Sequence, residues 1–390
     1  MCFKTFLMNI RLAFQCNHRV VLITLLSLSV INPMYAQKAS DMSARISNER
    51  LRLNLEYITS DYFFGRKSGS ASEANVAQFL ARHYQLMNIP GAKGGKGTET
   101  YLQHFNYKRG NNVKQSQNVA AIIHGNDPDL RNEYVVLVAH YDHLGIGTPV
   151  DGDSIYNGAA DDASGTVALM EIAEAFSKFT GKKPKLKRSV LFLHAGAEEE
   201  GLNGSTHFVL KEPLVRLEKI AAVINLDGVG GTDKPGSSQA SNYLYYLCTD
   251  STSTILKQEA LALNDQQFKL QLSPPENPEK YRSDNEPFNY HLIPTIYFST
   301  GLTEHYHKVT DEIENVDIDH LTKIVQFVAA LTMEFASHGN LKERDVRPQY
   351  QRSGKFICPP CSCSADGKLL DNDGSCPACG MQLYPHWVKR

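Results

Sequence analysis

The chain has 390 residues, of which 42% are hydrophobic and 21% are charged, and its formal net charge at pH 7 is −2. This composition is ordinary for a soluble globular protein. The length allows one large α/β domain with additions, or two to three domains of typical size. The balanced charge argues against the basic surface that nucleic-acid binding requires.

The first 36 residues have the pattern of an export signal. Lys4, Arg11 and Arg19 supply positive charge with no acidic residue, and the segment 20–31 is an apolar core of 12 residues. Ala36 then predicts cleavage directly after it. A short membrane anchor is the alternative, but the run is well below the roughly 20 residues that a spanning helix needs. We therefore expect no transmembrane segment in the mature chain and a periplasmic or extracellular location.

Apolar strands alternate with amphipathic helices from residue 118 onwards. Runs rich in β-branched residues predict buried strands at 118–125, 134–140, 189–195, 220–226 and 293–299. Apolar residues at helical spacing predict helices at 73–89, 164–179 and 319–338. This order predicts an α/β fold with a doubly wound, mostly parallel central sheet and helices on both of its faces.

The sequence divides into three parts after the signal. We expect a catalytic domain over residues 37–340. A charged stretch with few apolar residues predicts a linker over 341–355. Five of the eight cysteines then crowd into a small tail, residues 356–390, so the main body is not held by disulfides.

Polar residues follow the carboxyl ends of four predicted strands, where ligands bind in sheets of this kind. They are imidazoles and carboxylates, without a nucleophilic serine or cysteine set. Any one of them alone could be an ordinary surface group, and a solvated loop could explain the three consecutive glutamates. Together they suit zinc or a similar divalent ion in a hydrolytic site. The set comprises His140, Asp142, Asp161, Asp162, Glu198, Glu199, Glu200, Asp227, His305 and His307.

A site for two ions would explain this number of groups. Two ions roughly 3.5–4 Å apart need a bridging carboxylate and further ligands for each ion. One more carboxylate must bind neither ion, so that it can move a proton from water to the leaving amine.

Five motifs in chain order resemble the co-catalytic zinc exopeptidases of the bacterial leucyl aminopeptidase type, a family that also includes glutamate carboxypeptidase and the glutaminyl cyclases. They are AHYDHLG, GAADDASG, AEEEGLNGS, NLDGVG and YHKVTD, within residues 50–335.

The resemblance implies a role for each matching residue. His140 and Asp227 would bind one zinc, Glu199 and His307 would bind the other, and Asp161 would bridge the two. Glu198 would be the general base. Asp142 would support the ring of His140, whereas Glu200 would be solvated. Relatives often carry histidine where this chain has Asn285, so Asp284 and Asn285 are candidate substrate-binding residues.

The resulting expectation is an exported aminopeptidase that acts on peptides with two zinc ions. A carboxypeptidase, a glutaminyl cyclase and a non-catalytic binding protein of the same fold are the alternatives. The oligomeric state stays open.

The cysteine-rich tail contains two C-x2-C pairs separated by fourteen residues. Cys358, Cys361, Cys376 and Cys379 could bind one tetrahedral ion, which would be a further zinc, and CPACGMQLYP resembles short bacterial heavy-metal-binding modules. Two disulfides are the alternative in an exported protein. Cys363 would be a spare thiol in either case. About 35 residues bury too little apolar surface to fold alone, so we expect a metal or disulfides to stabilise this tail.

Overall fold

A computed structural model describes residues 41–109, 112–178, 186–238, 240–248, 254–337, 341, 349–359 and 363–390. The predicted signal segment, residues 342–348 of the predicted linker and Cys361 lie outside the described residues. Among the helices that are described, none has both the length and the apolar character needed to cross a membrane.

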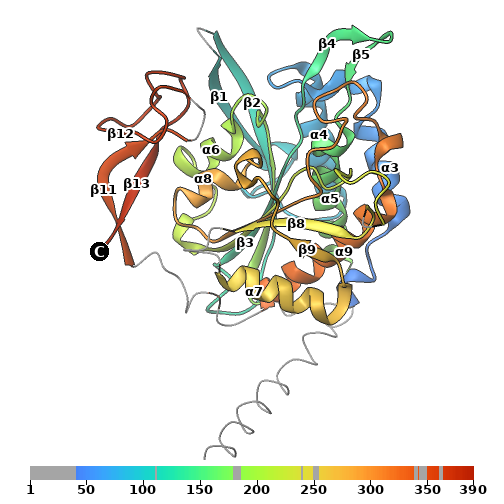
Figure 1. Ribbon diagram of the computed structural model, residues 1–390. Helices are drawn as coiled ribbons and strands as arrows, with labels where there is room; N and C mark the ends of the chain where they lie inside the picture. The colour runs from blue at the N-terminus through green and yellow to red at the C-terminus, as the bar shows by residue number, and fades with distance from the viewer. Residues whose placement is uncertain are drawn as a thin grey trace, which may run out of the picture.

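The domain predicted over residues 37–340 is built on an eight-stranded sheet with the order β1-β2-β6-β3-β7-β10-β8-β9 (Figure 1). Strands β6, β3, β7 and β10 lie parallel to one another in its centre. Strands β1 and β2 run antiparallel to their neighbours, whereas β8 runs antiparallel to β10 and parallel to β9. The prediction of a mostly parallel sheet is confirmed. The strands are β1 (Leu102–Arg109), β2 (Asn112–Ile123), β3 (Tyr134–His140), β6 (Ser189–Ala195), β7 (Ile220–Leu226), β8 (Tyr243–Cys248), β9 (Gln271–Ser273) and β10 (Thr295–Ser299).

The central strands are apolar because both of their faces are covered. Every residue of β6 and β7 is buried. Along β3, Val135 and Leu137 belong to one apolar cluster, whereas Val136 and Val138 belong to another, as the alternation of side chains in a strand requires. The sheet therefore separates two layers of the core.

Helices of unequal bulk cover the two faces. The larger cluster packs beneath α3 (Asn48–Ile58), α4 (Ala71–Leu86), α5 (Ser164–Ser177), α7 (Thr254–Leu263) and α9 (Ile318–Ser337). The smaller cluster contains Phe208 of α6 (Asn203–Leu210) and Phe288 of α8 (Asn285–Asn289). The predicted helices correspond to α4, α5 and α9.

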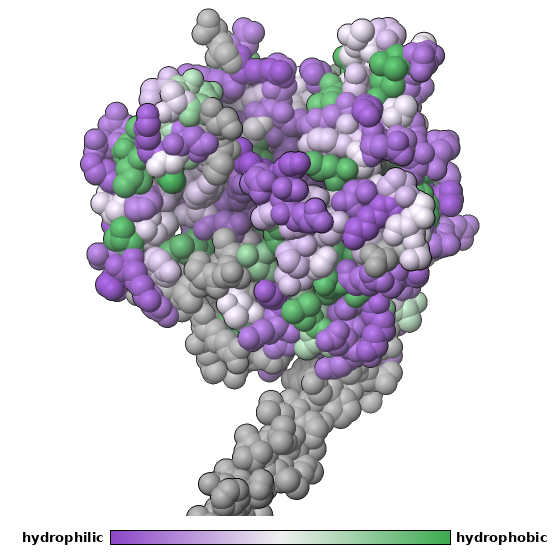
Figure 2. All heavy atoms as spheres, in the orientation of Figure 1, coloured by the Kyte–Doolittle hydropathy of each residue, from purple (hydrophilic) through white to green (hydrophobic). Residues whose placement is uncertain are grey.

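A two-stranded hairpin, β4 (Gly145–Val150) and β5 (Asp153–Tyr156), projects beside the sheet. Its Ile146 and Val150 are 57% and 49% exposed. Elsewhere on the face shown in Figure 2, hydrophilic residues dominate and hydrophobic residues lie in small separate groups.

The tail is a small antiparallel sheet with the order β12-β11-β13. It is formed by β11 (Tyr350–Ile357), β12 (Leu369–Leu370) and β13 (Tyr384–Lys389), and it lies beside α6 and α8 (Figure 1). Residues 350–355, which were predicted as linker, therefore belong to a strand. Because most residues of β11 are exposed or half-buried, its sequence lacks the apolar run that would have predicted it.

Candidate active site

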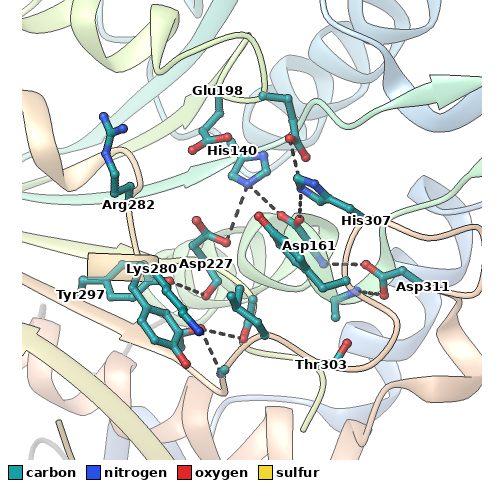
Figure 3. Close-up of a pocket in the computed structure, with 18 residues that line it drawn as sticks. His140, Asp161, Glu198, Asp227, Lys280, Arg282, Tyr297, Thr303, His307 and Asp311 are labelled. Carbon is teal, nitrogen blue, oxygen red and sulfur yellow. Dashed lines mark hydrogen bonds and ion pairs between the residues drawn. The ribbon is translucent and has the colours of Figure 1, made fainter. Parts of the chain in front are cut away.

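The carboxyl ends of the four central parallel strands meet at one pocket. His140 is the last residue of β3, Glu198 and Glu199 follow β6, Asp227 follows β7, and His307 follows β10. These five residues and Asp161, which lies in the turn before α5, all line the pocket (Figure 3). The structure thus brings together every metal ligand predicted for the catalytic domain, together with the predicted base.

Asp161 lies between the two histidines. Its Oδ1 is 3.2 Å from His140 Nε2, and its Oδ2 is 3.1 Å from His307 Nε2. Each carboxylate oxygen therefore faces a different imidazole, which is the arrangement that a bridging ligand requires.

The remaining carboxylates divide between the two histidines. Asp227 Oδ1 lies 3.8 Å from His140 Nε2, and Glu199 Oε2 lies 3.3 Å from His307 Nε2. On the first side, donor atoms of His140, Glu198 and Asp227 all lie within 4.8 Å of one another. On the second side, donor atoms of Asp161 and Glu199 form a similar group with His143. Nitrogen and oxygen donors gathered in this way fit two zinc-class ions.

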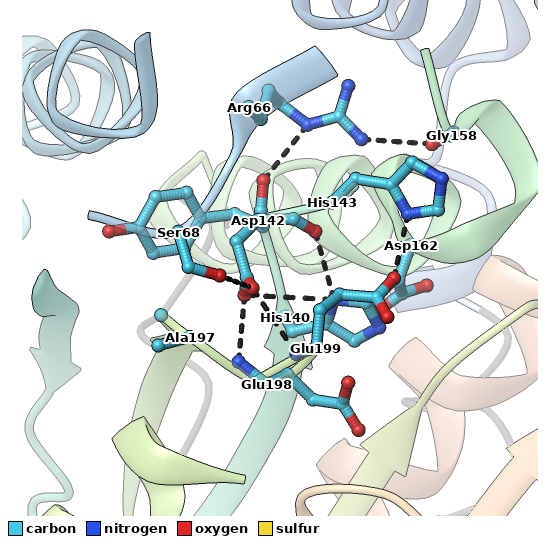
Figure 4. Close-up of polar contacts among 12 residues, drawn as sticks. Arg66, Ser68, His140, Asp142, His143, Gly158, Asp162, Ala197, Glu198 and Glu199 are labelled. Carbon is cyan, nitrogen blue, oxygen red and sulfur yellow. Dashed lines mark hydrogen bonds and ion pairs between the residues drawn. The ribbon is translucent and has the colours of Figure 1, made fainter. Parts of the chain in front are cut away.

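Asp142 organises the loop that carries the glutamates (Figure 4). It is fully buried, and its Oδ1 accepts a hydrogen bond of 3.0 Å from the backbone N–H of Glu198. Its Oδ2 accepts hydrogen bonds from the Glu199 N–H at 3.3 Å and from the Ser68 hydroxyl at 2.5 Å. The His140 ring meets the backbone carbonyl of Asp142, with Nδ1 3.1 Å from that oxygen, which fixes the ring orientation.

Two contacts hold the other side of the pocket. Asp311 accepts hydrogen bonds from the backbone N–H groups of Ala160 and Asp161, at 2.8 and 3.0 Å. The ring of Tyr306 stacks on His307 with a centroid distance of 3.9 Å. The motif YHKVTD therefore supplies a candidate ligand, the ring that packs on it and the carboxylate that anchors Asp161.

The pKa values of Glu198 and Asp161 shift in opposite directions. Burial raises the pKa of Glu198 well above its usual value, and the neighbouring Glu199, Asp284 and Asp227 raise it further against the effect of His140. Burial would also raise the pKa of Asp161, but its hydrogen bonds to His140 and His307 hold it far below the usual value.

A buried cation, Arg66, lies behind this acidic site. Its guanidinium is fully buried and donates to the backbone carbonyls of Tyr141 and Gly158 at 2.9 and 3.0 Å. Burial lowers its pKa to about 10, while Asp311 and Asp142 oppose that change. Arg66 therefore stays charged at neutral pH and offsets part of the repulsion among the carboxylates.

Three residues of this site were not singled out from the sequence. His143 Nδ1 lies 2.8 Å from Glu199 Oε1, and its place in the motif AHYDHLG was the available signal. Ser68 and Arg66 belong to the segment between α3 and α4, which carries no motif that the sequence analysis used.

Two expectations about the catalytic domain need correction. Glu200 is not solvated, because it forms an ion pair with Arg109 and its side chain is only 7% exposed. Asp284 and Asn285 are 0% and 7% exposed and are not among the residues that line the pocket. The preceding residues Lys280, Tyr281 and Arg282 line the pocket instead.

The tail cysteines form a separate cluster. Cys358, Cys363, Cys376 and Cys379 each place a sulfur within 4.8 Å of the others. Cys363 is therefore part of the cluster and not a spare thiol. Cys361 falls outside the described residues.

Comparison with solved structures identifies the class of fold. The aminopeptidase LapA of Legionella pneumophila superposes with a TM-score of 0.60 at 22% identity, covering 78% of this chain and 74% of that one. The glutaminyl cyclase of Porphyromonas gingivalis gives a TM-score of 0.55 at 20% identity, covering 74% of this chain and 98% of that one. The fold is thus the one shared by these enzymes, as the sequence predicted.

The sequence pattern of Peptidase family M28 matches residues 118–332, and the chain belongs to this family. The prediction of a peptidase is confirmed at that level. Among curated relatives, the aminopeptidase NAALADL1 of Mus musculus is 37% identical over 118 residues, which are 30% of this chain and 14% of that protein. The chain spans between 13% and 29% of the length of the first curated relatives that it matches.

Proposed function

We propose that the protein is an exported aminopeptidase that uses two zinc ions. The division of the two Asp161 oxygens between His140 and His307 carries this proposal, because one bridging carboxylate then serves two ligand groups. One ion would take His140, Asp227 and Asp161. The other would take His307, Glu199 and Asp161, with His143 adjoining Glu199. The chemistry that bound zinc supplies is polarisation of the scissile carbonyl and a lowered pKa of water.

Glu198 is suited to move the proton in this reaction. It lines the pocket, and its backbone N–H donates to Asp142, which places its carboxylate beside the proposed ligands. In its ionised form it accepts a proton from the attacking water, and it then returns that proton to the leaving amine. Asp142 acts as a positioning residue, since it contacts the backbone of Glu198 and Glu199.

A carboxypeptidase is the second candidate, because Lys280 and Arg282 line the same pocket and could attract a substrate carboxylate. Arg282 also pairs with Glu286 at 3.0 Å, so part of its charge is already balanced. A glutaminyl cyclase shares the fold, and a binding protein would be expected to lack ligands, whereas each predicted ligand of the catalytic domain is present.

Substrate hydrolysis separates these functions. Aminoacyl-nitroanilides should be cleaved, N-acetylation should abolish turnover, and removal of metal with a chelator should abolish it reversibly. Shortening of an N-blocked peptide from its C-terminus would assign a carboxypeptidase. Cyclisation of an N-terminal glutamine without hydrolysis would assign a cyclase.

Metal analysis tests the two-ion centre. A chain shortened to residues 37–345 lacks the tail cysteines and should bind close to two ions. A value near one ion per chain, in a shortened protein that keeps its full activity, would support the cyclase alternative. Export is tested by the mature N-terminus, which should begin at residue 37 when the full chain is produced in a secreting host.

A further inference from the structure

The four clustered cysteines of the tail come from two separate segments, one after β11 and one before β13. Cys358 directly follows β11, and Cys363 lies in the loop behind it, whereas Cys376 and Cys379 lie in the loop before β13. Cys358 and Cys376 are 0% and 2% exposed. The cluster therefore links the end of β11 to the loop that leads into β13.

The distances between the sulfurs have the scale of a metal site. Cys358 Sγ lies 3.6 Å from Cys379 Sγ and 4.0 Å from Cys363 Sγ, and Cys363 Sγ lies 3.9 Å from Cys376 Sγ. A zinc–sulfur bond of about 2.3 Å places the sulfurs of a tetrahedral site about 3.8 Å apart. A disulfide would require about 2 Å between two sulfurs. These separations match the edges of a tetrahedron around one ion.

Backbone amides point at two of the sulfurs. The N–H of Ala365 donates to Cys363 Sγ at 3.3 Å, and the N–H groups of Ala378 and Cys379 donate to Cys376 Sγ. Such hydrogen bonds favour the thiolate, which is the form that binds metal. Cys363 thus has the surroundings of a ligand, although no C-x2-C pair includes it.

The apolar core of the tail is too small to replace an ion. Its buried members are Cys358, Ala365, Cys376 and Leu383, so two of the four are themselves cysteines of the cluster. A segment of this size gains its folding free energy from a metal or a cross-link. The sulfur cluster lies where that contribution is needed.

We propose that Cys358, Cys363, Cys376 and Cys379 together bind one zinc-class ion that holds the tail in its folded form. Cys363 completes this set of four, and a tetrahedral ion with four ligands would not need Cys361. The ion would join the end of β11 to the loop before β13, in which Leu383 N–H donates to the carbonyl of Gly374 at 2.6 Å. This loop leads directly into Tyr384, through which the tail contacts the catalytic domain.

Cobalt substitution of the reduced full-length mature chain tests the ligand set. Thiolate ligands give Co²⁺ a charge-transfer absorption in the near ultraviolet, which imidazole and carboxylate ligands do not give. This absorption therefore reports on the tail alone and does not depend on the catalytic centre or on the proposed peptidase activity. We expect this absorption in the parent chain. Its intensity should fall by at least one quarter in Cys363→Ser, because one of four thiolate ligands is lost, and should stay unchanged in the matched control Cys361→Ser.

Alkylation of the unmutated, zinc-loaded chain gives a second test that does not depend on how a variant folds. Mass mapping should find Cys361 modified, with Cys358, Cys363, Cys376 and Cys379 protected until a chelator is added. Protection of Cys361 with modification of Cys363 would overturn the ligand set. Absence of the charge-transfer absorption, or thiols that appear only under reductant, would overturn the metal site.

Discussion

The two clusters of metal-ligand type in this protein are built in opposite ways. The ligand groups of the active site come from positions as distant as His140 and His307, and all except Asp161 lie at or after the end of a strand of the central sheet. The tail cysteines lie within one short segment, Cys358–Cys379, with little apolar core around them. We infer that the sheet can hold the first set in place before an ion binds, whereas the second set would need its proposed ion in order to fold.

The two clusters also differ in the fixed groups that stabilise their charged ligands. In the active site, fixed groups such as Arg66 and the backbone N–H groups beside Asp142 and Asp311 stabilise closely spaced carboxylates. Among the described residues of the tail, backbone amides such as that of Ala365 serve this purpose for the sulfurs. A change in one catalytic side chain should therefore leave the active-site frame intact, whereas a change in the tail ion should alter the fold of the tail.

The largest effect is expected for Glu198→Gln. Glutamine keeps the shape of the side chain but cannot accept a proton, so kcat should fall by about 10²–10⁴. The metal content should stay unchanged if the sheet fixes the ligands. Parallel measurement of kcat and bound metal checks both points. Glu200→Gln is the matched control, because Glu200 pairs with Arg109 outside the ligand set. An equal loss in the control would mean that the assignment of the three glutamates is wrong.

Much of the active site could be predicted because the strands that carry it are continuous apolar runs in the sequence. The buried runs of β3, β6 and β7 have the predicted bounds, and the strand-end rule then selects His140, Glu198 and Asp227. The link from Asp142 to the amides of Glu198 and Glu199 was not predictable, because it depends on how the loop after β6 folds back over the end of β3.

Other features depend on tertiary packing that no local pattern encodes. Glu200 would be solvated on an isolated loop, but strand β1 brings Arg109 to it. Asp284 follows pocket-lining residues in sequence, yet the turn into α8 buries it. In the tail, the spacing of the cysteines indicates a metal site, but only the path of the loop determines which thiols meet.

The second prediction concerns removal of metal from the active site. Burial alone would lower the pKa of His307, but its hydrogen bonds to Asp161 and Glu199 outweigh burial and raise the pKa to about 10 in the metal-free protein. This charged imidazole stabilises the folded state fully below about pH 6.5, and the contribution is lost as the pH rises through about 10. Metal bound at Nε2 would displace that proton.

Thermal unfolding between pH 6.5 and 10 measures this effect. The melting temperature of the metal-free protein should fall across the range, while that of the zinc-loaded protein should change less. In addition, affinity for an ion that displaces one proton should fall about tenfold for each pH unit below the pKa of His307. His307→Gln should flatten the metal-free profile. A metal-free protein that gains stability with rising pH would contradict the assignment.

A third prediction follows from the hydrogen bonds that Asp142 accepts from the backbone N–H groups of Glu198 and Glu199. Asp142→Asn would turn an amide N–H₂ group toward a site where only acceptors satisfy the neighbouring donors, which should cost about 1–3 kcal/mol in the free energy of unfolding. The activity should also fall, because Glu198 loses its anchor. Ser68→Ala removes a single donor and serves as the milder control, with a cost of about 1 kcal/mol. Denaturant unfolding and kcat should be measured together. If Asp142→Asn changes neither the free energy of unfolding nor kcat, the role assigned to Asp142 is wrong.

The smallest effect is expected where the tail contacts the catalytic domain. Tyr384 is 2% exposed, stacks on Tyr290 with a centroid distance of 4.5 Å, and its hydroxyl lies 2.6 Å from that of Thr206 in α6. Nearby, the indole N–H of Trp387 donates to the backbone carbonyl of Tyr290 at 2.7 Å. Trp387 is the single tryptophan of the chain, so its fluorescence reports on this contact directly.

Tyr384→Phe keeps the stacked ring but removes the hydroxyl, and it should weaken docking of the tail by about 1 kcal/mol, or roughly fivefold in the docking equilibrium. Thr206→Val removes the same hydrogen bond from the other side, so the double variant should be no weaker than either single one. Quenching of Trp387 by a soluble quencher measures the exposed fraction in each variant. Chelation of the tail ion should expose Trp387 far more than either substitution, because it removes the fold that presents Tyr384. Equal quenching before and after chelation would show that docking does not depend on the ion, and the contrast between a preformed and an ion-dependent cluster would then fail.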